Sequence, residues 1–165
     1  MNKNFLMWFG IAIAVLLGII WIAKPAPGAP LNGSAISTAG SFSASGNSFD
    51  FGAISMSRGK VKTTFTFKNT SSSSIAISRV YTSCMCTNAS LITSSGRVGP
   101  FGMPGHGFVP SVDKQIPAGE DAKIEVVFDP AAHGPAGIGP IERSVYVETE
   151  NSSPLVFNIK ANVTP

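Results

Sequence analysis

Hydrophobic and polar residues alternate in several short segments of this chain. The clearest are residues 60–68 and 123–128, where apolar side chains alternate with lysine, threonine or glutamate. A period of two sends successive side chains to opposite faces of a β-strand, so each segment predicts a strand that is buried on one face. The side chains expected in the core are Phe65, Phe67, Ile124, Val126 and Phe128.

Three further segments complete this pattern. Residues 144–148 and 155–163 alternate in the same way, and residues 75–82 are rich in β-branched residues. The alternation of the last segment slips at Ser78-Arg79, which indicates a β-bulge. Turn-forming residues separate the segments, and nothing after the N-terminal region shows a helical period. We therefore expect an all-β fold, an antiparallel β-sandwich of about seven strands.

The N-terminal region has a different character. Phe5 to Ala23 is a run of 19 residues without a charge, flanked by Lys3 and Lys24. At about 1.5 Å per residue, a helix of this length nearly spans the roughly 30 Å hydrocarbon core of a membrane. We expect residues 1–24 to be one transmembrane helix, an uncleaved anchor, with a cleaved signal peptide as the alternative. Either interpretation places the rest of the chain on the extracytoplasmic side.

Residues 25–48 consist almost entirely of Pro, Ala, Gly, Ser, Thr and Asn, and predict a flexible linker. The sandwich domain is then expected over residues 49–165. Within it, residues 88–117 and 129–140 are rich in Gly and Pro and break the strand pattern. We expect both to be long loops, which in compact domains usually carry function.

Charge and sequence motifs narrow the function. The formal net charge is +3 and no run of lysine or arginine occurs, which argues against nucleic-acid binding. No glycine-rich phosphate loop, serine nucleophile motif or pair of catalytic carboxylates is present. We therefore expect neither an enzyme nor an organic cofactor, and the partners expected are the membrane and an envelope protein.

The two cysteines, Cys84 and Cys86, are separated by one residue. In an extended strand their side chains would leave the same face, with Cα atoms about 6.5 Å apart. Two sulfur atoms at this spacing can hold a metal ion. A disulfide and a pair of small buried thiols are the alternatives, and the disulfide would need the backbone to adjust.

Three other side chains could join the cysteines at a metal site. Met103 and His106 lie in the first predicted loop, and His133, the only other histidine, lies in the second. Thiolate, thioether and imidazole ligands together suit Cu(I), with Zn as a competitor that prefers harder ligands. We favour His106 over His133, because its loop follows the strand that carries the cysteines. Structural cysteines with incidental histidines remain the alternative.

Several segments also form a family pattern: Phe49-Asp50-Phe51-Gly52-Ala53-Ile54, Phe65-Thr66-Phe67-Lys68-Asn69-Thr70, Ser83-Cys84-Met85-Cys86-Thr87, Ile116-Pro117-Ala118-Gly119-Glu120, Ile124-Glu125-Val126-Val127-Phe128-Asp129 and Val145-Tyr146-Val147-Glu148-Thr149. They resemble the bacterial "domain of unknown function 1573" family, which is immunoglobulin-like and similar to Hydin-type modules. The resemblance implies an exported, often membrane-anchored sandwich with no established reaction. Met85 replaces the glycine usual in that family, and both histidine-containing loops are longer than expected.

The sequence thus predicts a membrane-tethered binding or scaffold module with a soft-metal site at Cys84 and Cys86. The first alternative is a structural envelope domain in which the cysteines form a structural pair and partner proteins bind the sandwich. A thiol enzyme that uses a Cys-His pair is the second alternative.

Overall fold

The computed structural model describes residues 37–39, 41–106, 110–150 and 152–165. The predicted membrane anchor at 1–24 and the first part of the predicted linker lie outside these residues. Within the described residues, no helix is both long and apolar enough to cross a membrane.

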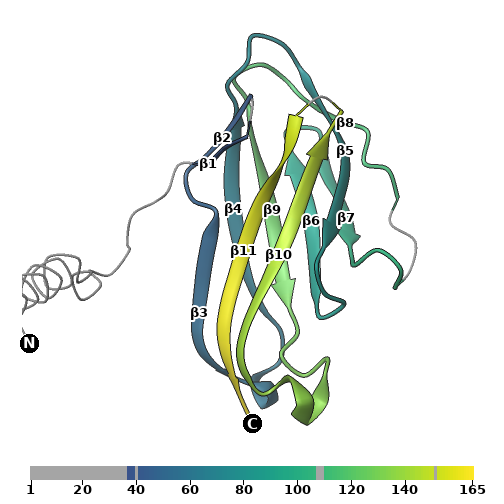
Figure 1. Cartoon of the computed structure of the whole chain (residues 1–165). Helices are drawn as coiled ribbons and strands as arrows, with labels where there is room; N and C mark the ends of the chain where they lie inside the picture. The colour runs from purple at the N-terminus through teal and green to yellow at the C-terminus, as the bar shows by residue number, and fades with distance from the viewer. Residues whose placement is uncertain (1–36, 40, 107–109, 151) are drawn as a thin grey trace, which may run out of the picture. The chain divides into compact units, whose positions relative to one another are not determined.

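Two β-sheets pack face to face (Figure 1). One sheet has the order β1-β2-β4-β9-β6-β7, made of Ser37–Ala39, Phe42–Ala44, Val61–Asn69, Asp121–Phe128, Thr87–Thr93 and Gly96–Phe101. The other has the order β3-β11-β10-β5-β8, made of Ser48–Ser55, Ser152–Thr164, Gly139–Thr149, Ile75–Thr82 and Lys114–Ile116. Two short 3-10 helices, η1 (Met56–Arg58) and η2 (Gly134–Gly137), lie in the connections.

The predicted all-β sandwich is confirmed, with two differences in detail. The described residues form eleven strands rather than about seven. One pair is parallel, because β3 runs along the edge of the second sheet in the same direction as β11. All the other strand pairs of the described residues are antiparallel.

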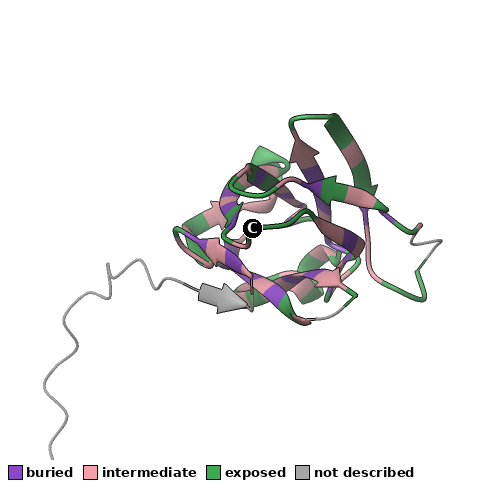
Figure 2. Cartoon of the chain, turned by 90° about the horizontal axis from the view of Figure 1, so that it is seen from above, coloured by how far each residue is buried: buried purple, intermediate pink, exposed green. Residues whose placement is uncertain are grey.

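The core forms where the alternating segments face each other. Buried and exposed positions alternate along the strands in Figure 2, as a period of two requires. Phe65 of β4 stacks on Phe157 of β11 with ring centroids 4.9 Å apart, which joins the two sheets. All five predicted core residues are buried: Phe65, Phe67, Ile124, Val126 and Phe128.

The bulge predicted in residues 75–82 is also present. Glu148 of β10 pairs with Arg79, but the next residue, Thr149, pairs with Ile77. Ser78 is therefore the extra residue of β5. Ile77 and Val80 can both point into the core because of it.

The domain begins earlier than the sequence suggests. Strands β1 and β2 fall within the predicted linker, and β2 pairs with β4. Phe42 is buried and its ring meets that of Phe67 edge to face, with centroids 5.3 Å apart. The linker prediction over 25–48 fails here because a three-residue strand is too short to show a period among Ser, Ala and Gly.

The predicted loop at 88–117 is wrong in its first half. Strands β6 and β7 form a hairpin there, and β6 pairs with β9 over its whole length up to Ile92. The inward-facing residues of β6 include Ala89 and Leu91, and a small residue such as alanine gives a weak hydrophobic pattern. By contrast, the second predicted loop contains no strand until β10 begins at Gly139.

Candidate metal centre

The two cysteines lie in the turn between β5 and β6, at the lower end of the sandwich in Figure 1. The backbone N–H of Thr87 donates to the carbonyl of Cys84 at 3.1 Å, and the hydroxyl of Thr82 donates to the same carbonyl at 3.0 Å. The turn brings the two Cα atoms to 5.3 Å, closer than the extended strand predicted from sequence would allow. Cys84 and Cys86 form a disulfide in this structure.

His133 reaches the cysteines because of the register between β6 and β9. Thr87, the first residue of β6, pairs with Phe128, the last residue of β9. The next residue, Asp129, donates its N–H to the carbonyl of Cys86 at 2.8 Å. The loop leading into η2 therefore starts beside the cysteines, and Nε2 of His133 lies 3.2 Å from Sγ of Cys84.

Arg143 of β10 completes the surroundings of the sulfur atoms. Two hydrogen bonds of 2.9 Å hold β10 to the cysteine turn. The N–H of Ser83 donates to the carbonyl of Ser144, and the N–H of Ser144 donates to the hydroxyl of Ser83. Nε of Arg143 then donates to Sγ of Cys86 at 3.4 Å. Arg143 is not among the residues predicted from sequence, although a signal exists. Arg143 occupies the inward position two residues before Val145, where the alternation calls for an apolar side chain.

Among the described residues, Cys84, Cys86 and His133 form a group whose ligand atoms all lie within 4.8 Å of one another. As whole residues the two cysteines differ in exposure, since Cys86 is only 1% exposed whereas Cys84 is half-buried. Met85, the residue between them in sequence, is 51% exposed. Such a set of two sulfur atoms and one imidazole nitrogen can hold a soft metal ion once the disulfide is reduced.

His106 and Met103, the other residues of the predicted site, lie in the loop after β7. His106 is exposed and closes a turn by donating its N–H to the carbonyl of Met103 at 3.2 Å. This loop is attached beside the cysteine turn, since the N–H of Thr82 donates to the carbonyl of Gly102 at 3.1 Å. His106 is nevertheless not part of the three-residue group, which contains His133. Met103 is half-buried at the start of the same loop.

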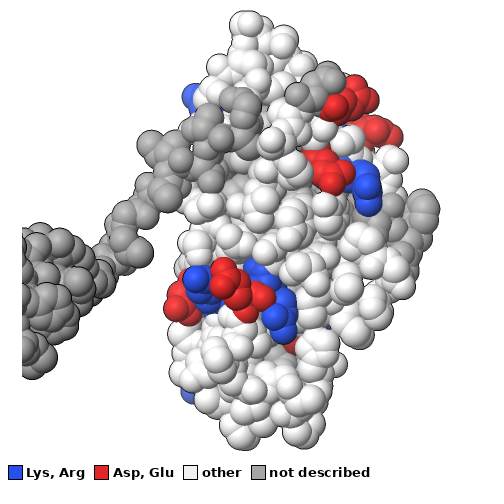
Figure 3. All heavy atoms as spheres, in the orientation of Figure 1, with Lys and Arg blue, Asp and Glu red and all other residues white. Residues whose placement is uncertain are grey.

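On the face of the domain that Figure 3 shows, charged residues are sparse and mixed in sign, and opposite charges lie next to each other. Arg79 pairs with Glu148 at 3.7 Å and lies over the ring of Tyr81, which itself stacks on Tyr146. Burial, together with the hydrogen bond that its hydroxyl donates to Glu148, raises the pKa of Tyr81. This face shows no concentration of positive charge of the kind that attracts a polyanion.

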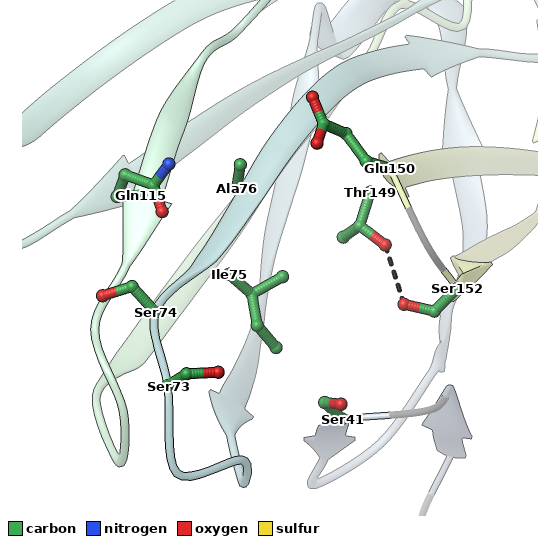
Figure 4. A pocket seen from close by; sticks show the side chains of 9 residues that line it. All are labelled: Ser41, Ser73, Ser74, Ile75, Ala76, Gln115, Thr149, Glu150 and Ser152. Carbon is green, nitrogen blue, oxygen red and sulfur yellow. Dashed lines mark hydrogen bonds between the residues drawn. The ribbon is translucent and has the colours of Figure 1, made fainter.

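A hollow of about 450 Å³ lies away from the cysteines, near the start of β5 and the β10–β11 turn (Figure 4). Its lining is mainly hydroxyl groups, with Gln115 and Glu150 as the larger polar side chains. Thr149 and Ser152 hydrogen-bond to each other across the β10–β11 turn at 2.8 Å. The hollow contains none of the sulfur or imidazole side chains that the sequence singled out.

The family comparison bears on the half of the domain that carries the cysteines. The model of the "Protein of unknown function (DUF1573)" family matches residues 42–100. Residues 42–100 carry the DUF1573 pattern. The predicted resemblance is thereby confirmed, and the matched segment includes both cysteines but neither histidine. No curated protein matches the chain.

Solved structures show the fold. A protein of unknown function from Porphyromonas gingivalis is 13% identical, with a TM-score of 0.50, and the match covers 70% of this chain and 44% of that one. A family 123 glycoside hydrolase from Clostridium perfringens is 10% identical, with a TM-score of 0.51, over 72% of this chain and 23% of the hydrolase. The PapD-like domain 7 of human CEP192 is 10% identical, with a TM-score of 0.45, and the match covers 85% of this chain and 96% of that one. This chain therefore spans less than half of the first two proteins, and the likeness concerns the fold alone.

Proposed function

We propose that this protein is an exported, membrane-tethered binding module that holds a soft metal ion, Cu(I), at Cys84, Cys86 and His133. The observation that carries the proposal is the convergence of two sulfur atoms and an imidazole nitrogen within 4.8 Å. These ligands come from two loops that are more than 40 residues apart in sequence and are joined by the β6–β9 register.

The charge of the site favours Cu(I) over Zn. Reduction of the disulfide yields two thiolates, so a bound Cu(I) ion leaves one net negative charge. The guanidinium of Arg143, which lies 3.4 Å from Sγ of Cys86, offsets that charge. Structural zinc sites usually have four protein ligands, whereas three residues converge here. Zn is therefore expected to bind more weakly.

Titration of the reduced full chain with Cu(I), against a competing chelator and without oxygen, tests the metal site. Cys84→Ala is expected to abolish binding, and His133→Ala to weaken it by at least about tenfold, since even outer partners of a metal site contribute that much. His106→Ala is the matched control, because it removes a histidine outside the group, and it should leave the affinity unchanged. Absence of Cu(I) binding to the reduced wild type, or equal losses for the two histidine variants, would contradict the proposal.

The tether has its own test. Leu16→Lys together with Leu17→Lys should release the protein from membranes, because each central lysine costs about 2.5–3.5 kcal/mol on insertion. Asn32→Lys with Ser34→Lys adds the same charge outside the apolar segment and should leave membrane retention intact. The measurement is the distribution between soluble and membrane fractions. A mature protein that begins after Ala26 would identify the segment as a signal peptide instead.

A structural envelope domain is the second candidate, and the burial of Cys86 favours it. Its side chain is 1% exposed and belongs to the hydrophobic core, as expected of a disulfide that fastens the β5–β6 turn. On this alternative, reduction lowers the free energy of unfolding and the reduced domain binds no metal. The same Cu(I) titration, combined with denaturation of the oxidised and reduced protein, separates the two candidates.

A further inference from the structure

Each sulfur atom of the disulfide lies next to hydrogen-bond donors. Cys86 Sγ receives Nε–H of Arg143 at 3.4 Å and lies 3.7 Å from the hydroxyl of Thr87. Cys84 Sγ receives the backbone N–H of Cys86 at 3.4 Å and lies 3.2 Å from Nε2 of His133. Disulfide sulfur is a weak acceptor, so these donors contribute little while the bond is intact. They stabilise strongly only when a sulfur atom becomes a thiolate.

The two cysteines also differ in exposure as whole residues. Cys84 is half-buried at the surface turn, whereas Cys86 is 1% exposed beneath it. Cys84 is thus the more exposed of the two residues, and its sulfur atom is the one that we take an incoming thiolate to attack. The buried sulfur is then the leaving group, and it is the one beside the permanent positive charge of Arg143. The partner thiolate thus attacks Cys84, and Cys86, whose thiolate is stabilised by Arg143, is the leaving group.

From these two features we infer that Cys84–Cys86 is a reactive disulfide, which oxidises dithiols of other exported proteins. A partner thiolate attacks Sγ of Cys84, the Sγ–Sγ bond breaks, and its electron pair passes to Cys86, whose thiolate is held by Arg143. A second partner thiolate then attacks the partner's own sulfur in the mixed disulfide and releases Cys84 as a thiolate beside His133. Two electrons pass from the partner dithiol to the cysteine pair, which ends as two thiolates. The two protons of the partner thiols go to water, and the partner leaves with a disulfide.

The surface around Cys84 fits a polypeptide substrate. Met85 and Ile138 are two of the large hydrophobic side chains exposed on the described surface, 51% and 46% respectively. Ile138 lines an open hollow of about 350 Å³ together with His133 and Arg143. Apolar side chains beside a reactive sulfur can contact the apolar residues around a partner's cysteines. The inference relies on the export part of the proposed function and not on metal binding.

Trapping of the mixed disulfide tests which sulfur reacts. The full chain, reduced and kept in EDTA and a Cu(I) chelator, is mixed with glutathione disulfide and followed by intact mass. Cys86→Ser should gain one glutathione on Cys84, and Cys84→Ser should react at least about tenfold more slowly, because Cys86 is buried. Equal rates for the two variants would overturn the assignment. Because metal is absent throughout, failure here is separate from failure of Cu(I) binding.

The rate of reduction tests the role of Arg143. Dithiothreitol, a simple dithiol, should reduce the wild-type disulfide under native conditions. Arg143→Gln should slow that step by about tenfold, because a poorer leaving group departs more slowly, and Arg143→Lys should restore part of the rate. Arg97→Gln removes the same charge at the far end of the β6–β7 hairpin and should have no effect. A wild-type disulfide that is reduced only in denaturant, or an unchanged rate in Arg143→Gln, would overturn the inference.

Discussion

The centre of the six-stranded sheet and the cysteine end of the sandwich are built from different kinds of interaction. Strands β4 and β9 pair without a break from Val61 opposite Phe128 to Lys68 opposite Asp121, and their inward side chains are large and apolar. At the cysteine end, three segments meet through backbone hydrogen bonds and polar contacts to sulfur. Extensive apolar packing and the polar contacts to sulfur therefore lie in different parts of the molecule.

This separation follows from what each part requires. Burial of a large apolar side chain contributes about 1.5–3 kcal/mol, and the regular strands of the centre bury many of them. The cysteine end needs polar groups near sulfur, and such groups would be costly within an apolar core. A turn and a loop at the rim can present them while remaining in contact with water. Variants in the two regions should accordingly differ in which property they change.

The largest expected effect on stability is that of Phe67→Ala at the centre. Phe67 is 1% exposed and contacts the rings of Phe42 and Phe157. Its removal should lower the free energy of unfolding by about 3–5 kcal/mol, measured by urea denaturation. Lys62→Ala on the outward face of β4 is the control and should change it by less than about 0.5 kcal/mol. A large loss from Lys62→Ala would mean that the outward face of β4 also contributes strongly to stability.

Phe42→Ala should follow closely, at about 3 kcal/mol, the lower end of the range for phenylalanine, since β2 is a short strand near the sheet edge. The same denaturation experiment measures it. Ser43→Ala, on the next residue and half-buried, is the matched control and should be nearly silent. If Phe42→Ala were equally silent, residues 37–48 would contribute nothing to the domain and the linker predicted from sequence would be the better description.

An intermediate effect is expected from Asn69→Ala. Asn69 lies at the end of β4 that is far from the cysteines. The Asn69 side chain is fully buried, and its Nδ2 lies 2.8 Å from the carbonyls of Ser73 and Ile116. Removal of the amide leaves these carbonyls unsatisfied and should cost about 2 kcal/mol. Asn162→Ala, on the exposed face of β11, is the matched control and should cost less than about 0.5 kcal/mol. Equal losses of stability for Asn69→Ala and Asn162→Ala would show that burial of the Asn69 amide does not determine the effect.

How much the sequence predicts differs between the two regions. The alternation in residues 60–68 and 123–128 predicts the strands and their buried faces, because large apolar side chains mark most of the alternate positions. Phe42 and the β6–β7 hairpin were missed because short strands with Ala, Ser and Gly give little contrast. Asn69 was missed because a buried amide resembles any turn-forming asparagine in a sequence.

The candidate site depends on strand pairing that a single sequence does not contain. Cys84 and Cys86 could be singled out from their spacing, but their turn geometry could not. His133 lies beside Cys84 only because Thr87 pairs with Phe128, so assigning it requires the β6–β9 register. His106 was preferred on nearness in sequence. The hairpin between Cys86 and His106 returns the chain to Thr82 through Gly102, but His106 lies outside the group formed by Cys84, Cys86 and His133.

The smallest expected effect on stability is that of His133→Ala at the cysteine end. His133 is exposed and contacts Cys84 through its ring nitrogen, so little apolar surface is lost when the ring is removed. The free energy of unfolding of the oxidised protein should change by less than about 0.5 kcal/mol, as for most surface substitutions. His106→Ala, the other exposed loop histidine, should behave the same in denaturation, so the two differ only in Cu(I) affinity. A loss for His133→Ala as large as that for Asn69→Ala would mean that the contact with Cys84 holds the fold together, and the division between a stabilising centre and a chemical rim would fail.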